Sequence, residues 1–207
     1  DALIQADRYY NDGDFTNNGL LEATDFYNNS NLHNTSDITL TNFTNADTAI
    51  NSGSIEFWDF TNLGGFDHTG TLDGSNDFSN LGNFYCSGSM NVDHDFFTGD
   101  SIDNIANFYV YDIVTVGNNF LNINLVDGSN TGQFCVQNLS GNDGNMTGEF
   151  EFCDNTNPGS LDYNTGTIDA SVTYCSSPCG TGVAENNVLI PEIYPNPTDS
   201  YIQINHV

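Results

Sequence analysis

The chain has 207 residues, and its 28 acidic side chains stand against a single basic one, Arg8, which leaves a formal net charge of −27. A surface of this charge repels nucleic acid and anionic membrane surfaces, so neither is expected as a partner. No stretch of 18 apolar residues occurs, so no insertion into a membrane is expected either. Aromatic residues make up 13% of the chain, which favours a packed core over disorder.

The first segment, residues 1–14, contains a short run with apolar and aromatic side chains, from Ala2 to Tyr10. If the chain forms stacked coils, this run can cover the unpaired backbone groups at the N-terminal end. It is equally placed to dock on another copy of the protein. Residues 1–14 are therefore predicted to be an N-terminal cap or docking segment.

A four-residue motif, Asp/Asn-Phe-x-Asn, recurs from residue 25 onward at steps of 17, 17 and 18 residues. Its copies are Asp25–Asn28, Asn42–Asn45, Asp59–Asn62 and Asp77–Asn80, and a degraded fifth copy begins at Asp95. A repeat of this length is one coil of a structure that stacks on itself. The spacing predicts an all-β fold, a right-handed parallel β-helix (β-solenoid) of about eight coils of 17–19 residues over residues 15–156. An antiparallel sandwich is the alternative, but it gives no reason for a motif to repeat in register.

Stacking at about 4.8 Å per coil places like residues on like residues. The motif phenylalanines should then form an aromatic stack, and the motif asparagines a ladder in which side-chain amides bond along the axis. The expected stack comprises Phe26, Phe43, Phe60 and Phe78. The expected ladder comprises Asn28, Asn45, Asn62 and Asn80.

Three further positions recur in each coil. Two apolar columns alternate with polar residues as in a strand with one buried face: Ile38, Ile55, Leu72 and Met90, and Leu40, Phe57, Gly74 and Val92. A third apolar column is expected at Leu32, Ile50, Phe66 and Phe84. Glycine recurs at Gly53, Gly70 and Gly88, which suggests a corner with a positive φ.

Five cysteines are present, and four of them lie in the last third of the chain: Cys135, Cys153, Cys175 and Cys179. Cys135 and Cys153 are one coil apart and could bridge, while Cys175 and Cys179 could close a tight turn. No histidine stands at zinc-ligand spacing from these cysteines, so disulfides in an exported protein are favoured over zinc. The pairing stays open at this point. Residues 157–187 are predicted to be a cysteine-containing bridging segment and linker.

Residues 188–207 carry the motif Tyr194-Pro195-Asn196-Pro197, followed by the alternating residues Tyr201, Ile202 and Ile204. This segment resembles the opening of the type A C-terminal sorting domain of the type IX secretion system of Bacteroidota. The resemblance covers only residues 188–207. It implies export by that machinery, then release or attachment at the cell surface. The residues by themselves predict a proline-rich turn and one short strand.

Candidate catalytic and metal-binding residues are sparse. Paired carboxylates would suit a glycoside hydrolase, but solvated turn residues are the favoured interpretation of the four candidates: Asp73, Asp77, Asp93 and Asp95. His33, His68 and His94 fall at different places in their coils, so no histidine cluster is expected. A polysaccharide lyase would need basic groups that are lacking here. The sequence predicts no enzyme and no cofactor, with structural calcium at Asp-Gly pairs as the alternative.

Two functions fit these features. The first is a secreted, non-enzymatic structural or adhesive protein of the cell surface or extracellular matrix, which self-associates through its coil ends into a filament or contacts other surface proteins. The second is a carbohydrate-binding or carbohydrate-active β-helix protein acting on extracellular polysaccharide. Trp58, Tyr85 and Tyr109 are the candidate glycan contacts. Phe57 is in the inward register, so Trp58 should point outward.

Overall fold

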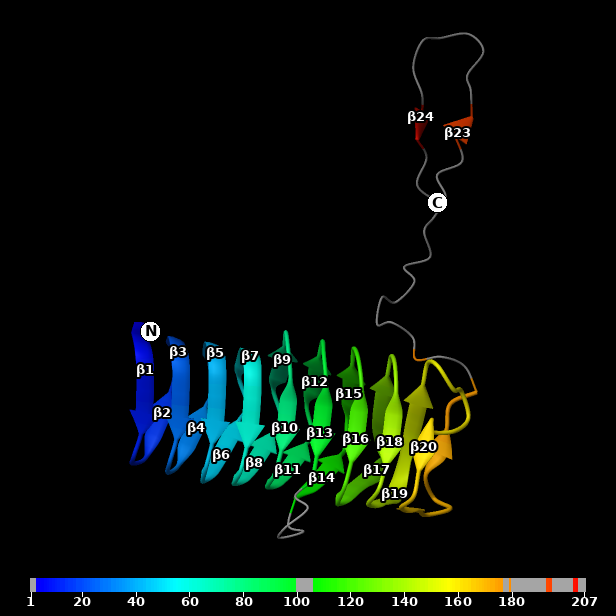
Figure 1. Cartoon of the computed structure of the whole chain (residues 1–207). Coiled ribbons are helices and arrows are strands. Elements are labelled where there is room, and N and C mark those ends of the chain that lie inside the picture. The colour runs from blue at the N-terminus through cyan, green and yellow to red at the C-terminus, as the bar shows by residue number, and fades with distance from the viewer. Residues whose placement is uncertain (1–2, 100–105, 177–178, 180–192, 195–202, 205–207) are drawn as a thin grey trace.

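A computed structural model of the chain describes residues 3–99, 106–176, 179, 193–194 and 203–204. In these residues there is no helix, and 22 strands belong to one parallel sheet that winds into a β-solenoid of about nine turns. The turns stack along one axis from β1 to the last strands of the sheet (Figure 1). The predicted fold class is confirmed. The described part of the chain accordingly offers no helix that could span a membrane.

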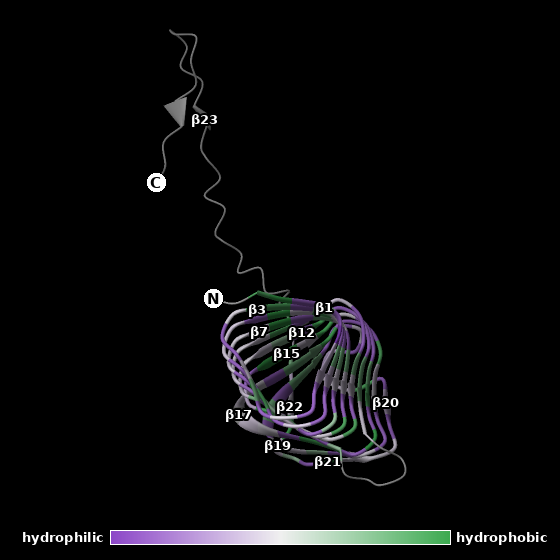
Figure 2. Ribbon diagram, turned by 90° about the vertical axis from the view of Figure 1, so that its left-hand side faces the viewer, coloured by the Kyte–Doolittle hydropathy of each residue, from purple (hydrophilic) through white to green (hydrophobic). Residues whose placement is uncertain are grey.

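The first coils alternate a long and a short strand. The long strands are β1 (Leu3–Asn11), β3 (Leu20–Asn28), β5 (Asp37–Asn45) and β7 (Ser54–Asn62). The short strands are β2 (Phe15–Asn17), β4 (Leu32–Asn34), β6 (Thr48–Asn51) and β8 (Gly65–His68). Successive coils superimpose when seen along the axis (Figure 2).

After β8 the long strand is divided, because the coil lengthens from 17 to 18 residues and the extra residue falls at the bend between Gly74 and Phe78. The strands here are β9 (Thr71–Gly74), β10 (Phe78–Asn80), β11 (Asn83–Cys86), β12 (Ser89–Val92), β13 (Phe96–Thr98), β14 (Asn107–Val110), β15 (Ile113–Val116) and β16 (Phe120–Asn122).

The last coils contain two longer strands and three short ones. These are β17 (Leu125–Val136), β18 (Ser140–Asn142), β19 (Asn145–Asp154), β20 (Tyr163–Asn164), β21 (Thr167–Ile168) and β22 (Thr173–Tyr174). A separate antiparallel pair, β23 (Ile193–Tyr194) and β24 (Gln203–Ile204), lies near the C-terminus of the sequence.

The solenoid is longer than the predicted range of 15–156. Leu3–Asn11 pairs residue by residue with Leu20–Asn28, so residues 3–11 form part of the first coil rather than a separate cap. At the other end, β20 to β22 pair in parallel with β18 and β19, so the sheet reaches Tyr174. The sequence motif is degraded in these outer coils, while the alternation that builds the strands continues.

The core is a set of apolar columns, and the motif phenylalanines form the central one. Phe26, Phe43, Phe60 and Phe78 are each 1% exposed or less, and their neighbouring ring centroids are 5.3, 4.5 and 5.0 Å apart. The predicted columns through Ile38 and Leu40 also lie in register across the coils.

The third predicted column contains one error. Ala49, not Ile50, occupies the interior position between Leu32 and Phe66, and Ile50 is 40% exposed. Ala49 and Ile50 are both apolar, so hydrophobicity alone does not decide which of the two points inward. Asn51 must point inward to join Asn34, and this requirement turns Ile50 outward because neighbouring strand residues face opposite sides.

The recurring glycines serve close packing rather than a positive φ. Gly53, Gly70 and Gly88 are not among the described glycines with positive φ. A Cβ atom built on Gly70 would instead lie 1.9 Å from the backbone oxygen of Gly53 in the preceding coil, and one on Gly88 would lie 2.3 Å from the oxygen of Gly70. Glycine is therefore required because the corners of successive coils touch through their backbones.

We expect Gly70→Ala to destabilise the protein by about 1 to 3 kcal/mol, since the methyl group forces two coils apart at a backbone contact. Gly65→Ala is the matched control, because a Cβ at Gly65 meets nothing within 4 Å. Urea unfolding followed by circular dichroism measures both variants. Equal midpoints for the two would show that coil contact does not explain the glycine at position 70.

Candidate functional site

Amide side chains form a hydrogen-bonded ladder along the solenoid. The Nδ2 atom of each asparagine donates to the Oδ1 atom of the asparagine one coil further on, at 2.7 Å for Asn28 to Asn45, 2.8 Å for Asn45 to Asn62 and 2.8 Å for Asn62 to Asn80. These four side chains are fully buried. Each asparagine stands two residues after the motif phenylalanine and, like it, points into the solenoid. The ladder therefore gives these buried amides hydrogen-bond partners that an apolar core could not supply.

The ladder extends beyond the predicted asparagines. Asn11 begins it by donating to Asn28 at 2.6 Å. Thr98 replaces asparagine in the degraded fifth motif and accepts from Asn80 at 3.1 Å through its Oγ1 atom. Asparagine returns in the next coils, where Asn122 donates to Asn142 at 2.7 Å and Asn142 to Asn164 at 2.8 Å.

A second ladder, which the Asp/Asn-Phe-x-Asn motif does not predict, runs along the short strands. Asn17 donates to Asn34 at 2.8 Å, and Asn34 donates to Asn51 at 2.7 Å. His68 takes the next position and meets Asn51 at 3.1 Å. The step of 17 residues between these positions is the signal that could have revealed the second ladder. The polar series then stops, because Cys86 follows His68 in register.

His68 is a buried, neutral member of this ladder. Its Nε2 atom lies 2.9 Å from the carbonyl oxygen of Ser89, which can only accept, so Nε2 carries the proton. Its Nδ1 atom is then the acceptor for the Nδ2 of Asn51. Burial lowers the pKa of His68 below the ordinary value of 6.5, since the protonated ring would lose its hydration and its acceptor role.

This geometry predicts a pH-dependent stability. Below about 6.5 the unfolded chain binds a proton on His68 that the folded chain does not, so stability should fall as the pH drops, by at most about 1.4 kcal/mol per pH unit. In His68→Asn, the new amide can accept from Asn51 and donate to Ser89, which keeps the ladder and removes the titration. Urea midpoints between pH 5 and 7.5 should therefore depend less on pH in this variant.

His94 supplies the control for this prediction because its pKa shifts in the opposite direction. Its hydrogen bond to Asp77 raises the pKa, so the contribution of His94 is present below pH 6.5 and lost as the pH rises through the folded value. His94→Gln should leave the acid-side loss of stability in place. An unchanged slope in His68→Asn would contradict the assignment of that loss to His68.

The four acidic candidates for hydrolase chemistry divide into two hydrogen-bond networks. Asn91 bridges Asp73 and Asp93 through its Nδ2 atom, at 3.0 and 2.8 Å. His94 lies 2.6 Å from Asp77 and 3.8 Å from Asp95, a contact that the separate coil positions of the histidines did not predict.

The cluster of Asp77, His94 and Asp95 has the ligand types of a cation site. Its groups are about half exposed, with 50% of the His94 side chain accessible. The Oδ1 atom of Asp95 already accepts from Asn118 and from the backbone and side chain of Asn119. These contacts explain why Asp77, His94 and Asp95 lie together: they form a hydrogen-bonded corner between coils, and no cation is needed to hold them.

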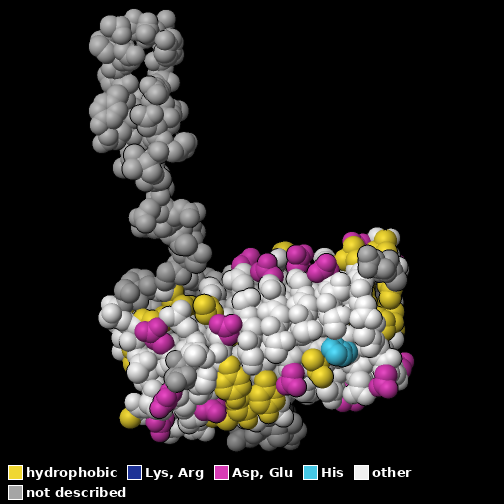
Figure 3. Space-filling view, turned by 180° about the vertical axis from the view of Figure 1, so that it is seen from behind, with side chains coloured by type: hydrophobic (Ala, Val, Ile, Leu, Met, Phe, Trp, Pro, Cys, Tyr) yellow, Lys and Arg dark blue, Asp and Glu magenta, His cyan; other side chains and the backbone are white. Residues whose placement is uncertain are grey.

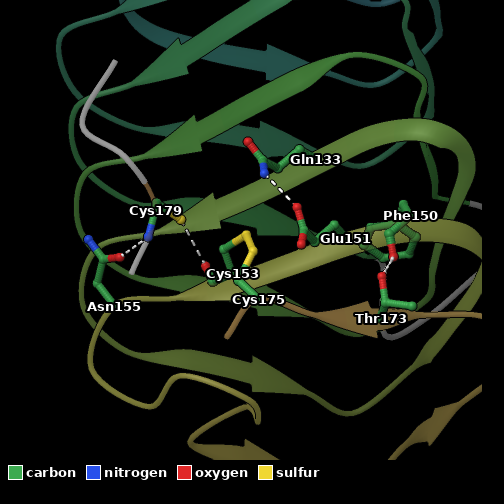
Figure 4. Close-up of a disulfide and its surroundings, with 8 residues drawn as sticks. All are labelled: Gln133, Phe150, Glu151, Cys153, Asn155, Thr173, Cys175 and Cys179. Carbon is green, nitrogen blue, oxygen red and sulfur yellow. Dashed lines mark hydrogen bonds between the residues drawn. A yellow bond between two sulfur atoms is a disulfide. The ribbon is translucent and has the colours of Figure 1, made fainter. Parts of the chain in front are cut away.

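The four clustered cysteines come together at the C-terminal end of the solenoid, and the disulfide that forms decides the pairing that the sequence left open. Cys135 and Cys153 stand in register on β17 and β19, yet the disulfide joins Cys153 to Cys175, whose Cα atoms are 4.9 Å apart (Figure 4). Cys175 follows β22 directly, and β22 pairs with β19, so Cys175 reaches Cys153 from the next coil. Sequence spacing alone could not choose between the two neighbours of Cys153.

A groove follows the bend of the long strands along the first coils. One hollow is lined by residues of β1, β3 and β5, including Asp7 and Glu22, and a second by residues of β5, β7 and the turn after β9, including Glu56 and Trp58. The two hollows share residues 39–41 and therefore lie side by side. Trp58 is 52% exposed and Phe57 3% exposed, which confirms their predicted orientations.

A second aromatic surface lies on the outer side of the short strands. Tyr85 and Tyr109 stack with their ring centroids 4.4 Å apart, and Asp67 and Asp127 stand in register at the two ends of the pair. Figure 3 shows a hydrophobic patch on this side of the solenoid with acidic side chains beside it. Each ring covers one face of the other, and the remaining two faces lie toward the register positions of Asp67 and Asp127.

The sorting motif lies mostly outside the described residues. Tyr194 belongs to β23, whereas Pro195, Asn196 and Pro197 are not described. Comparison with known protein families, curated proteins and solved structures finds no match. A functional assignment therefore rests on the geometry of the chain itself.

Proposed function

We propose that this protein is a secreted, non-enzymatic structural or adhesive protein whose solenoid stacks end to end on further copies of itself. The observation that carries the proposal is the match between the two ends of the solenoid. Three columns of residues that run through the coils end on complementary groups, and these groups meet if the C-terminal end of one copy is placed on the N-terminal end of the next.

The N-terminal end presents an open strand edge with an apolar interior. In the described chain, β1 pairs only with β3 and β2 only with β4, so the outer edges of both strands are unpaired. Ile4, Tyr9 and Phe15 pack on the core but stay half-buried, because no coil covers them. An uncovered parallel edge of this kind favours the addition of another strand.

The C-terminal end continues the same columns. Following the register through the sheet, Tyr174 stands in the column that begins at Ile4, and Ile168 in the column that begins at Phe15. Tyr174 and Ile168 are also partly buried against the core. Head-to-tail stacking would cover apolar surface on both copies in these two columns.

The amide ladder gives the stacking of two copies a direction, because its two ends differ in hydrogen-bonding character. Each member donates toward the C-terminal end, so Asn11 keeps acceptor capacity at its Oδ1 atom, which receives only a 3.4 Å contact from Gly13. In the part of the chain that the structure describes, the Nδ2 atom of Asn164 has no acceptor. Asn164 of one copy and Asn11 of the next are therefore a donor and an acceptor at the ends of one column.

The setting outside the cell is supported by two features. The resemblance of residues 188–207 to a type IX sorting domain implies export, and the Cys153–Cys175 disulfide suits an oxidising compartment. The net charge of −27 sets a condition on assembly, since copies repel each other until salt screens them. Stacking should therefore require moderate salt or divalent cations.

Light scattering and negative-stain electron microscopy of the whole chain test the proposal between 10 and about 300 mM salt, where the Debye length falls from about 30 Å to below 8 Å. The expected result is monomers at low salt and rods of increasing length at high salt. Ile4→Glu should abolish the rods by charging the end face, while Leu3→Glu, which places the same charge on the outward side of β1, should retain them. Monomers in all conditions would overturn the proposal.

A second candidate function, binding of a neutral glycan, is favoured by the groove beside Trp58. An exposed tryptophan next to carboxylates and threonines offers a stacking surface and hydrogen-bond partners for a sugar, while the charge disfavours polyanionic polysaccharides. A glycan array followed by calorimetry should then find a neutral ligand whose affinity falls at least tenfold in Trp58→Ala but not in Tyr85→Ala. No hit on the array would exclude this function.

A further inference from the structure

Three of the cysteines form a column across the last coils. Cys135, Cys153 and Cys175 occupy successive coils at one position, because Cys135 pairs with Cys153 and the residues before Cys175 pair with those before Cys153. The central cysteine can bond to only one neighbour. Since Cys153 is bonded to Cys175, Cys135 is left with a free thiol at a buried position.

Cys179 returns to this column from the segment beyond β22. Its backbone N–H donates to Asn155 at 2.5 Å, and its Sγ atom lies 3.3 Å from the carbonyl oxygen of Cys153 (Figure 4). The Sγ atoms of Cys135, Cys153 and Cys179 all lie within 4.8 Å of one another, and Cys135 and Cys179 are 4% and 7% exposed. Among the described free thiols, Cys135 and Cys179 are therefore close enough to bond to each other.

We propose that Cys135 and Cys179 form a second disulfide, which fastens residue 179 against the last coils of the solenoid, beside β17 and β19. The two thiols lose two protons and two electrons, and the electrons reduce an external disulfide, such as oxidised glutathione, to two thiols. The hydrogen bond from Cys135 lowers the pKa of Cys179, so Cys179 is the thiolate that attacks the external disulfide. Cys135 then attacks the Cys179 sulfur of the mixed disulfide, forms the Cys135–Cys179 bond and releases the second external thiol.

The fifth cysteine, Cys86, is not expected to form a disulfide, and a zinc site at the cysteine cluster is not expected either. Cys86 is fully buried, donates to the carbonyl oxygen of Gly88 at 3.3 Å and has its pKa raised by burial, so it should remain a thiol. A structural zinc site takes four Cys or His ligands, and the described cluster offers cysteines but no histidine. The bond between Cys153 and Cys175 leaves two of these cysteines.

The second disulfide would have a structural consequence at the end of the chain. The Cys153–Cys175 bond joins neighbouring coils. The Cys135–Cys179 bond would join β17 to the segment that follows Cys175. Both bonds would hold the coil that carries Tyr174, and the segment after Cys179 would leave the solenoid from a fixed point. This inference does not depend on the proposed end-to-end assembly.

Peptide mapping without reduction tests the pairing in the whole chain after equilibration with oxidised glutathione. Trypsin is unsuitable because the only basic residue is Arg8, but cleavage before aspartate places the cysteines on peptides 127–142, 143–153 and 169–198. The proposal requires all three peptides in one linked product and a single alkylated thiol, at Cys86. Fragmentation at the Ser177–Pro178 bond then assigns Cys175 and Cys179 separately.

Other outcomes would overturn the proposal. A product joining only 127–142 to 143–153 means that Cys175 and Cys179 pair with each other. Fragments that place Cys135 on Cys175 mean crossed pairing. Three alkylated thiols mean that the second bond does not form, and one equivalent of zinc per chain with free thiols means a metal site.

Thermal unfolding gives an independent readout. The double variant Cys135→Ser/Cys179→Ser should lower the unfolding midpoint by about 5 °C under oxidising conditions and not under reducing conditions, because the difference comes only from the cross-link. Cys86→Ala is the cysteine control and should retain the difference between oxidising and reducing conditions. An equal loss for the double variant in both conditions would assign the effect to packing and contradict the bond.

Discussion

Replacing Asn45 by alanine is expected to lower the free energy of unfolding by about 3 to 5 kcal/mol, because a buried polar group left unsatisfied costs about 1 to 3 kcal/mol. The Nδ2 atom of Asn45 donates to Asn62 at 2.8 Å and to the carbonyl oxygens of Asp47 and Gly65 at 2.9 and 3.1 Å. Its Oδ1 atom accepts from Asn28 at 2.7 Å. Truncation removes all four bonds at once, and the buried Asn28 Nδ2 and Asn62 Oδ1 atoms each lose their ladder partner.

Asn29→Ala is the matched control for this prediction. Asn29 is an exposed asparagine one position beyond the same ladder, and its side chain donates to Asp12 across neighbouring coils at 2.9 Å. Its removal should cost less than about 0.5 kcal/mol, as is usual for exposed positions. Urea unfolding by circular dichroism compares the two variants. A loss at Asn45 no greater than at Asn29 would mean that the ladder contributes little to stability.

Replacing Phe60 by alanine is the second change with a large expected effect, also about 3 to 5 kcal/mol, since it removes a buried ring and leaves a cavity. Phe60 is 1% exposed. It belongs to the central column, and its ring centroid is within 5.2 Å of those of Phe43, Phe57, Phe66 and Phe78. The coils above and below cannot close the gap because their ladder bonds fix the spacing.

Trp58→Ala provides the control from the same strand. Trp58 is larger than Phe60 but 52% exposed, so its truncation should cost less than about 1 kcal/mol. The same unfolding assay applies. A loss at Trp58 equal to that at Phe60 would show that burial in the central column is not what makes Phe60 important. The variant also separates stability from glycan binding at the groove.

Much of the fold followed from the sequence because stacked coils turn a linear repeat into columns. The positions of Phe26, Phe43 and Phe60 are set by a step of 17 residues, and a strand's alternation decides which neighbours point inward. The same step would have located the second ladder at Asn17, Asn34 and Asn51. That ladder was missed because its asparagines have no distinctive neighbour such as the motif phenylalanine.

Other features depended on contacts that no local pattern contains. Gly70 is required by the backbone of Gly53 in the preceding coil, a contact defined only once the coils are aligned. Ile50 turns outward because Asn51 joins a ladder on the inside. His94 meets Asp77 only because their corners are stacked.

By itself, the sequence determined that this chain is a parallel β-solenoid with an amide ladder and an aromatic stack, since the repeat length and the alternation of side chains require no knowledge of distant contacts. Tertiary structure decided the partner of Cys153, the close approach of Cys179 to Cys135, and the partial burial of Ile4 and Tyr174 at the two ends of one column. Each of these depends on how coils far apart in the sequence align along the axis. That alignment is the sum of many small contacts over the whole stack, and no single repeat specifies it.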